Sequence, residues 1–310
     1  MIDRPAIEAA YARIANHVRE TPVMTLPASM TGEGFDLALK LELFQHTGSF
    51  KPRGAFNNLL SRAVGEAGVV AASGGNHGAA VAFAARALGI PANIFVPAIS
   101  DPVKIDRIRS YGATLHVGGD RYADALARSV ELREKTGAID VHAYDADETI
   151  AGQGTVGLEW SRQTPGLDTV LVAVGGGGLI SGIAAWFGRE VRVIGVEPSG
   201  SRALHAALEA GGPVDVPVKS VAADSLGAAN VGQRVHDICA RNLDRVLLVE
   251  DEAIVAAQKR LWSDFRIAAE PGGATAISAL WSGAYKPAPG ETLGVLVCGG
   301  NVDLTKLAAL

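Results

Sequence analysis

From about Gly68 onward, hydrophobic and polar positions follow two alternating patterns along the chain. Short runs rich in valine and isoleucine, typical of buried strands, alternate with longer segments whose apolar residues recur at helical spacing. This alternation predicts an α/β fold with mostly parallel, twisted sheets and helices on both faces. The predicted strands are 68–72, 90–97, 113–119, 138–144, 167–174, 191–198, 243–250 and 292–300. The predicted helices are 79–89, 101–112, 120–137, 179–188, 201–211, 252–265 and 273–283.

One uncharged run, Val170–Gly188, is long enough to raise the question of a membrane-spanning helix. Four successive glycines, Gly175–Gly178, interrupt the run, and each costs a helix roughly 1 kcal/mol relative to alanine. We therefore expect a strand, a glycine turn and a helix. Residues 1–14 predict an amphipathic helix without the apolar core of a signal peptide. The irregular stretch 211–232 is the longest predicted loop.

The charge balance points to small-molecule partners. In 310 residues, 28 lysine and arginine side chains stand against 33 aspartates and glutamates, which gives a net charge of −5. This composition gives no sign of a nucleic-acid surface or of a polybasic membrane patch. The two cysteines, Cys239 and Cys298, form no paired motif or disulfide framework, which fits a reducing cytoplasm.

A lysine in an unusual setting is the first candidate for chemistry. In the segment 47–55, TGSFKPRGA, Lys51 follows Gly48 and Ser49 and precedes Pro52, a residue favoured at the first helical position. The positive end of a helix dipole would lower the pKa of the amine, as a nucleophilic or Schiff-base lysine requires. Taken alone, the segment also fits a surface lysine near a helix cap.

Two further glycine-rich turns lie between predicted strands and helices. SGGNHG, Ser73–Gly78, presents backbone N–H groups at a helix start and predicts an anion site, with Asn76 as a further donor. His77 in this turn is either a general base or a structural hydrogen-bonding residue. GGGGLISG, Gly175–Gly182, suits a phosphate held by backbone N–H groups, although a purely structural glycine turn is the alternative.

The second of these turns also supports another cofactor. Gly176, Gly178 and Gly182 resemble part of a dinucleotide-binding fingerprint, and the next predicted strand ends near Glu197, where a ribose-binding acid would belong. An NAD-linked oxidoreductase leaves the lysine segment and the turn at 73–78 unexplained, however. A Schiff-base lysine, a phosphate site and a second anion site have one economical explanation, which is pyridoxal 5'-phosphate.

The combination resembles the serine/threonine dehydratase and serine racemase family of fold-type II pyridoxal-phosphate enzymes. The resemblance extends from about residue 20 to 305, and its motifs occur in the family's order. They are GSFKPRGA, SGGNHG, GGGGLISG, GVEP, AEPGGA and CGGNVD. The resemblance implies a two-lobed fold, with a large cofactor-binding domain at 1–67 and 146–310 and a small domain at 68–145 inserted in it.

The resemblance also implies roles for individual residues. Lys51 would carry the cofactor as a Schiff base and, once freed, would take the Cα proton of the substrate. Phe50 would border the cofactor ring, and Asn76 would hydrogen-bond its 3-hydroxyl group. The substrate carboxylate would be bound by the backbone of Ser73, Gly74, Gly75, Asn76 and His77. The cofactor phosphate would be bound by Gly175, Gly176, Gly177, Gly178 and Leu179.

Four further positions bear on the reaction. Glu270 would lie near the ring, and Cys298 would lie near the ring nitrogen. A neutral thiol stabilises a protonated pyridine less than a carboxylate does, which favours elimination over transamination. The plainer alternatives are a helix-start carboxylate for Glu270 and a buried apolar residue for Cys298. Gly74 replaces the serine that a racemase uses on the second face of the substrate, which favours dehydration. The family's divalent-cation site would begin at Glu197, but Ala203 replaces a further acid, so metal binding stays open.

The resemblance therefore implies a pyridoxal-phosphate-dependent dehydratase, or ammonia-lyase. It would convert a β-hydroxy amino acid such as L-serine or L-threonine into a 2-oxo acid and ammonia. A serine racemase with the same cofactor is the alternative, and the NAD-linked oxidoreductase comes third. A cytoplasmic homodimer without nucleic-acid or membrane partners is expected. The preferred substrate cannot be read from the sequence, although the loop 220–232 and the turn 73–77 are expected to shape it.

Overall fold

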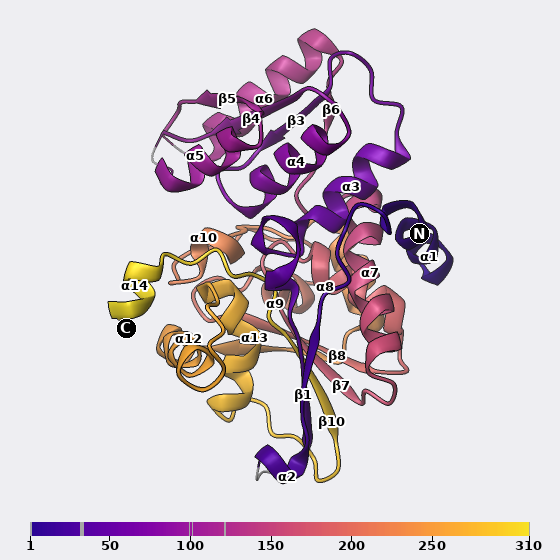
Figure 1. Cartoon of the computed structure of the whole chain (residues 1–310), viewed down its shortest axis with the longest axis vertical. Coiled ribbons are helices and arrows are strands. Elements are labelled where there is room, and N and C mark those ends of the chain that lie inside the picture. Colours follow the sequence, from indigo (N-terminus) through magenta and orange to yellow (C-terminus); the bar gives the residue numbers. More distant parts are fainter. Residues whose placement is uncertain (1, 32–33, 99, 101, 121, 310) are drawn as a thin grey trace.

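The computed structural model describes residues 2–31, 34–98, 100, 102–120 and 122–309. Within them, ten strands form a six-stranded and a four-stranded sheet, and helices lie on both sides of the larger sheet (Figure 1). Among the named strands, the pairs are parallel except for β1 with β2. The structure confirms the predicted α/β class with mostly parallel sheets.

The larger sheet has the strand order β1-β2-β10-β7-β8-β9. Its central strands are almost fully buried, because α13 packs against β7 and β8 and α8 packs against the same two strands. Burial on both faces explains why these strands read as continuous apolar runs. The strands are β1 Val23–Leu26, β2 Asp36–Lys40, β7 Thr169–Ala173, β8 Arg192–Pro198, β9 Arg245–Val249 and β10 Thr292–Leu296.

The smaller sheet has the strand order β5-β4-β3-β6 and lies in the upper part of Figure 1. Its strands are β3 Val69–Ala72, β4 Ala92–Val96, β5 Thr114–Val117 and β6 Ile139–Asp140. All four strands fall within the predicted small domain, whereas the six strands of the other sheet fall outside it. The domain boundaries at 68 and 145 stay a prediction, since sheet membership alone does not define where a domain ends.

The helices alternate with the strands as the periodicity predicts. In the first half of the chain they are α1 Arg4–Ile14, α2 Ala28–Thr31, α3 Lys51–Ser61, α4 Asn76–Ala87, α5 Pro102–Ser110, α6 Tyr122–Thr136 and α7 Asp147–Gln163. In the second half they are α8 Gly178–Phe187, α9 Ala203–Ala210, α10 Ala223–Leu226, α11 Gln233–Asn242, α12 Asp251–Phe265, α13 Pro271–Trp281 and α14 Leu304–Ala309. Two short 3₁₀ turns, Glu42–Phe44 and His46–Gly48, lead into α3.

Helix α7 is a long element that the sequence did not predict. Glycines weaken a helical pattern, and this segment contains Gly152, Gly154 and Gly157. The structure gives them a packing reason: a Cβ atom on Gly152 would lie 2.6 Å from the backbone oxygen of Arg53 on α3. The glycines therefore let α7 approach its neighbours closely. Strands β1 and β2 and helix α11 were also missed, and β6 is shorter than predicted.

The uncharged run at 170–188 forms strand β7, a glycine turn and helix α8, as predicted. Among the described residues, no helix has the length and apolar character needed to cross a bilayer. The predicted loop at 211–232 contains only the short helix α10, and this loop reaches the site described next.

Candidate active site

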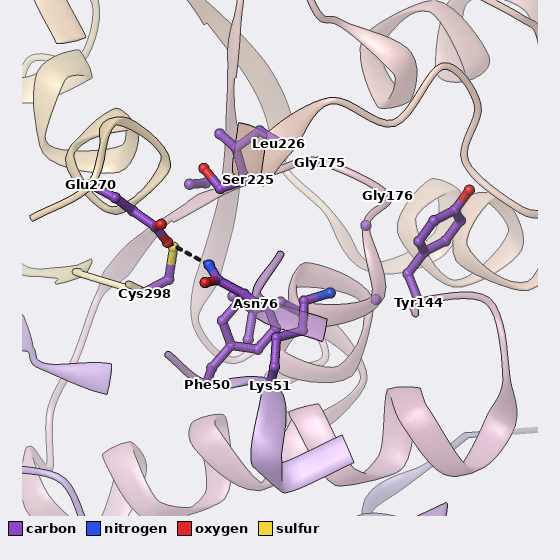
Figure 2. Close-up of a pocket in the computed structure, with 14 residues that line it drawn as sticks. Phe50, Lys51, Asn76, Tyr144, Gly175, Gly176, Ser225, Leu226, Glu270 and Cys298 are labelled. Carbon is purple, nitrogen blue, oxygen red and sulfur yellow. Dashed lines mark hydrogen bonds between the residues drawn. The ribbon is translucent and has the colours of Figure 1, made fainter. Parts of the chain in front are cut away.

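A pocket lies where several glycine-rich segments meet, at the carboxyl ends of β7 and β10 (Figure 2). Ligands of open α/β sheets bind at this edge. The pocket is lined by Phe50, Lys51, Asn76, Tyr144, Ala173, Gly175, Gly176, Gly177, Gly178, Leu179, Ser225, Leu226, Glu270 and Cys298. The structure thus brings together the lysine segment, the tetraglycine turn, Asn76, Glu270 and Cys298, which the sequence singled out separately.

Lys51 is the first residue of α3, and its amine points into the pocket (Figure 2). Its Nζ donates a hydrogen bond to the carbonyl oxygen of Ala143 at 3.0 Å and lies 5.1 Å from the ring centroid of Phe50. Burial lowers the pKa of Lys51 to about 8, although Cys298 and Glu270 act in the opposite direction. The pKa is lowered in the predicted direction, but the cause is burial and not the helix dipole named from the sequence. At pH 7 roughly a tenth of such an amine is neutral and nucleophilic, far more than for a lysine of ordinary pKa.

Two motifs far apart in sequence hold the start of α3. The N–H of Phe50 donates to the carbonyl of Cys298 at 3.2 Å, and the N–H of Gly300 donates to the carbonyl of Gly48 at 2.9 Å. Ser49 forms an isolated β-bridge with Gly299 between these bonds. The GSFK and CGGN segments are therefore one structural unit. Pro52 occupies the second helical position, not the predicted first one. At the second position, too, its missing N–H costs no hydrogen bond within the helix.

Asn76 begins helix α4, and its amide points to Glu270, which precedes α13 (Figure 2). Its Nδ2 donates to Oε1 of Glu270 at 2.7 Å, and its Oδ1 accepts from Nδ2 of Asn301 at 2.6 Å. Glu270 is 7% exposed, and burial raises its pKa to about 7 against the effect of the Asn76 hydrogen bond. The pocket therefore contains an amide of fixed orientation beside a carboxyl group that titrates near neutrality.

The tetraglycine turn connects β7 to α8. No described residue accepts a hydrogen bond from the backbone N–H groups of Gly176–Leu179. These donors, with the dipole of α8, form a site for an anion such as a phosphate. The turn also has a packing reason for its glycines, because a Cβ atom on Gly176 would lie 2.2 Å from the ring of Tyr144. The structural and the phosphate-binding interpretations are thus compatible.

Cys298 follows β10 and is buried. Its Sγ donates to the carbonyl of Gly272 at 3.5 Å, and burial raises the pKa of the thiol to about 12. The side chain is therefore a neutral thiol at physiological pH, and it lines the pocket opposite Tyr144 (Figure 2).

The turn at 73–77 contributes only Asn76 to the pocket lining. Ser73, Gly74, Gly75 and His77 lie beside the pocket without lining it. The ring of His77 is hydrogen-bonded through Nε2 to the carbonyl of Val141 at 2.7 Å, and burial lowers its pKa to about 3. This geometry supports the structural alternative for the histidine. The predicted contact between the backbone of 73–77 and a substrate carboxylate stays a prediction.

Both carboxylate oxygens of Glu197 are engaged by the protein backbone. Its two carboxylate oxygens accept hydrogen bonds from the backbone N–H groups of Leu204 and His205 at 2.9 and 2.8 Å. The side chain thus binds the free donors at the start of α9, and burial raises its pKa to about 7. No group of three potential ligand residues in the described parts of the chain is arranged to hold a metal. The question of a divalent cation stays open.

Sequence reasoning missed five residues of this region. Ser225 and Leu226 line the pocket from the loop 220–232. The sequence predicted that this loop shapes substrate choice, but it did not single out these two residues. Tyr144 is the last residue of a predicted strand, and the carboxyl ends of strands are where a signal could have been sought. Ala173 lies near the tetraglycine turn, and Asn301 lies inside the CGGNVD motif, but neither residue was singled out.

The residues of the pocket fit pyridoxal phosphate. The cofactor needs an amine for covalent attachment, donors for a phosphate and polar groups at its ring. Lys51 provides an amine of lowered pKa, and the turn at 176–179 provides backbone donors that lack an acceptor within the described chain. Asn76 and Cys298 provide a polar amide and a neutral thiol.

Comparison with known proteins agrees with this fit. A family model described as pyridoxal-phosphate dependent enzyme matches residues 14–299. Phenylserine dehydratase of Ralstonia pickettii is 38% identical over 313 residues, which cover 99% of this chain and 95% of the relative. L-threonine ammonia-lyase of Geobacter sulfurreducens is 36% identical, with 100% of this chain and 78% of the relative covered. The solved structure of maize serine racemase matches with a TM-score of 0.93 at 36% identity, covering 99% of this chain and 96% of that one.

These matches decide between the two cofactor hypotheses. They support pyridoxal phosphate. The dinucleotide fingerprint in the glycine turn is a local similarity, since none of the relatives named above is an NAD-linked oxidoreductase. The relatives include dehydratases, ammonia-lyases and a racemase, all named for amino-acid substrates. This chain belongs to the family of pyridoxal-phosphate dependent enzymes, as a fold-type II enzyme acting on amino acids.

Proposed function

We propose that the protein is a dehydratase that converts a β-hydroxy amino acid, such as L-serine or L-threonine, into a 2-oxo acid and ammonia. The observation that carries this proposal is Gly74. A Cβ atom there would lie 2.6 Å from Oγ of Ser100 and 2.7 Å from Cγ1 of Val96, so a side chain does not fit without displacing its neighbours. Racemisation requires a proton on the second face of Cα, and position 74 offers no group to deliver it. Ser100 has a nearby hydroxyl, but it is not among the pocket residues.

The chain's own residues divide the remaining tasks. Lys51 would hold the cofactor covalently and then remove the Cα proton, for which its lowered pKa and its position inside the pocket are suited. When bound, pyridoxal phosphate supplies an electron-withdrawing ring that stabilises negative charge at Cα. The N–H groups of Gly176–Leu179 would bind the phosphate, and the amide of Asn76 would bind the ring hydroxyl. Cys298, as a neutral thiol, would offer no negative charge to the ring nitrogen.

The substrate would be bound at the mouth of the same pocket. We propose that its carboxylate meets the backbone of 73–77 at the start of α4, where the helix dipole favours an anion. The N–H groups of Ser73 and Gly75 already donate to Phe95 and Ser73, so the donors for the carboxylate would be those of Gly74, Asn76 and His77, which have no acceptor among the described residues. Its side chain would then face the residues that the loop and the strand end contribute, which are Tyr144, Ser225 and Leu226. These three residues would decide between small and bulky β-hydroxy amino acids.

The experiment is an assay of purified holoenzyme with a panel of L-serine, L-threonine, phenylserine and hydroxyaspartate. We expect 2-oxo acid and ammonia in equal amounts from at least one of them. Chiral chromatography of the remaining amino acid tests the racemase alternative, which the similarity to a serine racemase motivates. Substantial D-serine from L-serine with little pyruvate would contradict the proposal.

We also propose that the enzyme is a homodimer in the cytoplasm, as the family resemblance implies. The absence of a paired-cysteine motif fits a reducing compartment. Light scattering during size-exclusion chromatography tests the dimer: a mass near 32.0 kDa, that of a single chain, would contradict it.

A further inference from the structure

A strained backbone position lies four residues before Lys51. Thr47 has φ +59°, in the left-handed region that non-glycine residues rarely adopt. This conformation turns the carbonyl oxygen of Thr47 toward two donors. Nη2 of Arg107 donates to it at 2.9 Å, and Nδ2 of Asn301 donates to it at 2.8 Å. Strain of this kind persists where surrounding contacts hold it in place, so these two side chains are candidates for a specific role.

The two side chains also contact each other and the active site. Nη1 of Arg107 donates to Oδ1 of Asn301, and Nδ2 of Asn301 donates to Oδ1 of Asn76 at 2.6 Å. Asn76 in turn donates through Nδ2 to Glu270 at 2.7 Å. Hydrogen bonds therefore run without interruption from Arg107 on α5 to the carboxyl group of Glu270 inside the pocket. We call the set Arg107, Asn301 and Asn76 the amide relay.

The chemistry of the end groups fixes the direction of the relay. A guanidinium group only donates hydrogen bonds, and a backbone carbonyl only accepts them. The amide of Asn301 must therefore turn its oxygen to Arg107 and its nitrogen to the carbonyl of Thr47. The same nitrogen then meets the oxygen of Asn76, which leaves the nitrogen of Asn76 facing Glu270 and the pocket.

We propose that Arg107 and Asn301 are positioning residues that set the amide orientation of Asn76 and thereby its contact with the cofactor ring. The proposal rests on the place of Asn76 at the cofactor given under the proposed function. Arg107 lies among the elements of the smaller sheet, whereas Thr47 and Asn301 adjoin the larger one. The position of α5, which carries Arg107, therefore affects which way the amide of Asn76 faces at the cofactor.

A glycine beside the relay gives independent support. A Cβ atom on Gly48 would lie 2.4 Å from Oδ1 of Asn301 and 3.5 Å from Nη2 of Arg107. A side chain at this position would therefore displace the relay. A second contact of α5, the ion pair between Lys104 and Asp224 at 2.7 Å, is more exposed and is not part of the relay.

The main test variant is Asn301→Asp. The carboxylate keeps Arg107 as its partner, and Arg107 still donates to the carbonyl of Thr47 after the bond from position 301 is lost. Because a carboxylate only accepts hydrogen bonds, it forces the amide of Asn76 to turn over. We expect the affinity of the apoenzyme for added pyridoxal phosphate to fall about tenfold, as befits one or two misdirected hydrogen bonds. The visible absorption band of the holoenzyme should also shift, while the melting temperature of the apoenzyme stays close to that of the wild type.

Arg107→Met and Arg107→Lys form the companion pair. The methionine variant should show the same loss of cofactor affinity, and the lysine variant should recover part of it, because an ammonium group still donates to one of the two acceptors. Arg109→Ala is the matched control on the same helix: its guanidinium group pairs with Asp106 at the surface and does not touch the relay. It should bind the cofactor like the wild type.

Asn76→Ala distinguishes the contact of Asn76 with the cofactor ring from the effect of Arg107 and Asn301 on that contact. If it leaves cofactor affinity unchanged, the proposed ring contact is wrong and the relay loses its purpose. If it weakens binding while Asn301→Asp and Arg107→Met stay within twofold of the wild type, the relay proposal alone is overturned. A loss of affinity that only accompanies an equal loss of melting temperature also overturns it, since Arg107 and Asn301 would then serve as scaffold.

Discussion

Lys51 and Arg53 lie two residues apart on α3, but their electrical surroundings are opposite. Arg53 is fully buried, and its guanidinium group donates to Glu42 at 2.7 and 2.9 Å and to Glu159 at 2.9 and 3.0 Å. Although burial disfavours its charge, these carboxylates hold the pKa of Arg53 above its usual value. Lys51 has no carboxylate partner within the described chain and donates only to a carbonyl oxygen.

The difference shows how one helix turn can hold a scaffold cation and a reactive amine together. A buried cation with carboxylate partners keeps its proton, whereas a buried cation without them tends to lose it. Lys40 contacts Glu159 in the same buried cluster and so belongs to the scaffold, although burial lowers its pKa against the effect of Glu42 and Glu159. The cluster of Lys40, Glu42, Arg53 and Glu159 thus anchors the helix whose first residue has the lowered pKa.

The largest expected effect comes from removing the reactive amine. Lys51→Ala should abolish the visible absorption of the bound cofactor and reduce turnover by at least about 10³-fold, since covalent attachment and proton transfer both depend on this group. Absorption spectroscopy and the 2-oxo acid assay measure the two losses. Lys104→Ala is the matched control, because Lys104 pairs with an exposed aspartate outside the pocket. A Lys51→Ala enzyme with more than a tenth of wild-type activity would rule out the assignment.

The second effect separates the two cations by stability. Arg53→Met should lower the free energy of unfolding by about 3–5 kcal/mol, because it leaves Glu42 and Glu159 buried without their shared partner. Lys51→Met should cost far less, since no ion pair is broken there. Urea unfolding of the apoenzymes compares them. Equal losses in the two variants would show that the distinction drawn between these cations is wrong.

The third effect is the pH at which the amine reacts. Attachment of pyridoxal phosphate to the apoenzyme, followed by visible absorption, should show a midpoint near pH 8 rather than near the ordinary lysine pKa of 10.5. The unfolded chain holds this proton up to about pH 10.5 and the folded chain releases it near pH 8, so Lys51 makes the free energy of unfolding rise with pH between these values. Lys51→Met should remove that rise. A midpoint close to 10.5 would contradict the unpaired environment of the amine.

The smallest expected effect is that of Glu270 on the pKa of Lys51. Because Glu270 raises the pKa of Lys51, Glu270→Gln should move the reaction midpoint downward, by less than about one pH unit given the remaining opposing groups. Glu197→Gln is the control, since this buried glutamate binds the start of α9 instead of facing the pocket. An upward movement in Glu270→Gln, or an equal movement in both variants, would show that Glu270 does not act on Lys51.

Periodicity predicted most of the fold because strands and helices of an α/β protein differ in their spacing of apolar residues. It failed at α7, where Gly152 weakens the helical pattern and yet allows close packing against α3. The motifs predicted Lys51 and the tetraglycine turn because both are local in sequence. The bond between Arg107 and Asn301 joins residues 194 positions apart and has no such signature. Contacts of this kind follow from the tertiary fold alone.

The most direct test of the account is borohydride reduction of the holoenzyme followed by peptide mapping. Reduction fixes a cofactor that is bound to an amine, and mass spectrometry then identifies the modified lysine. The account predicts the added mass on the peptide that contains Lys51 and on no other lysine peptide. Modification at Lys40 or Lys104, or no modification of a yellow enzyme at any lysine, would contradict the central claim that the unpaired amine of α3 carries the cofactor.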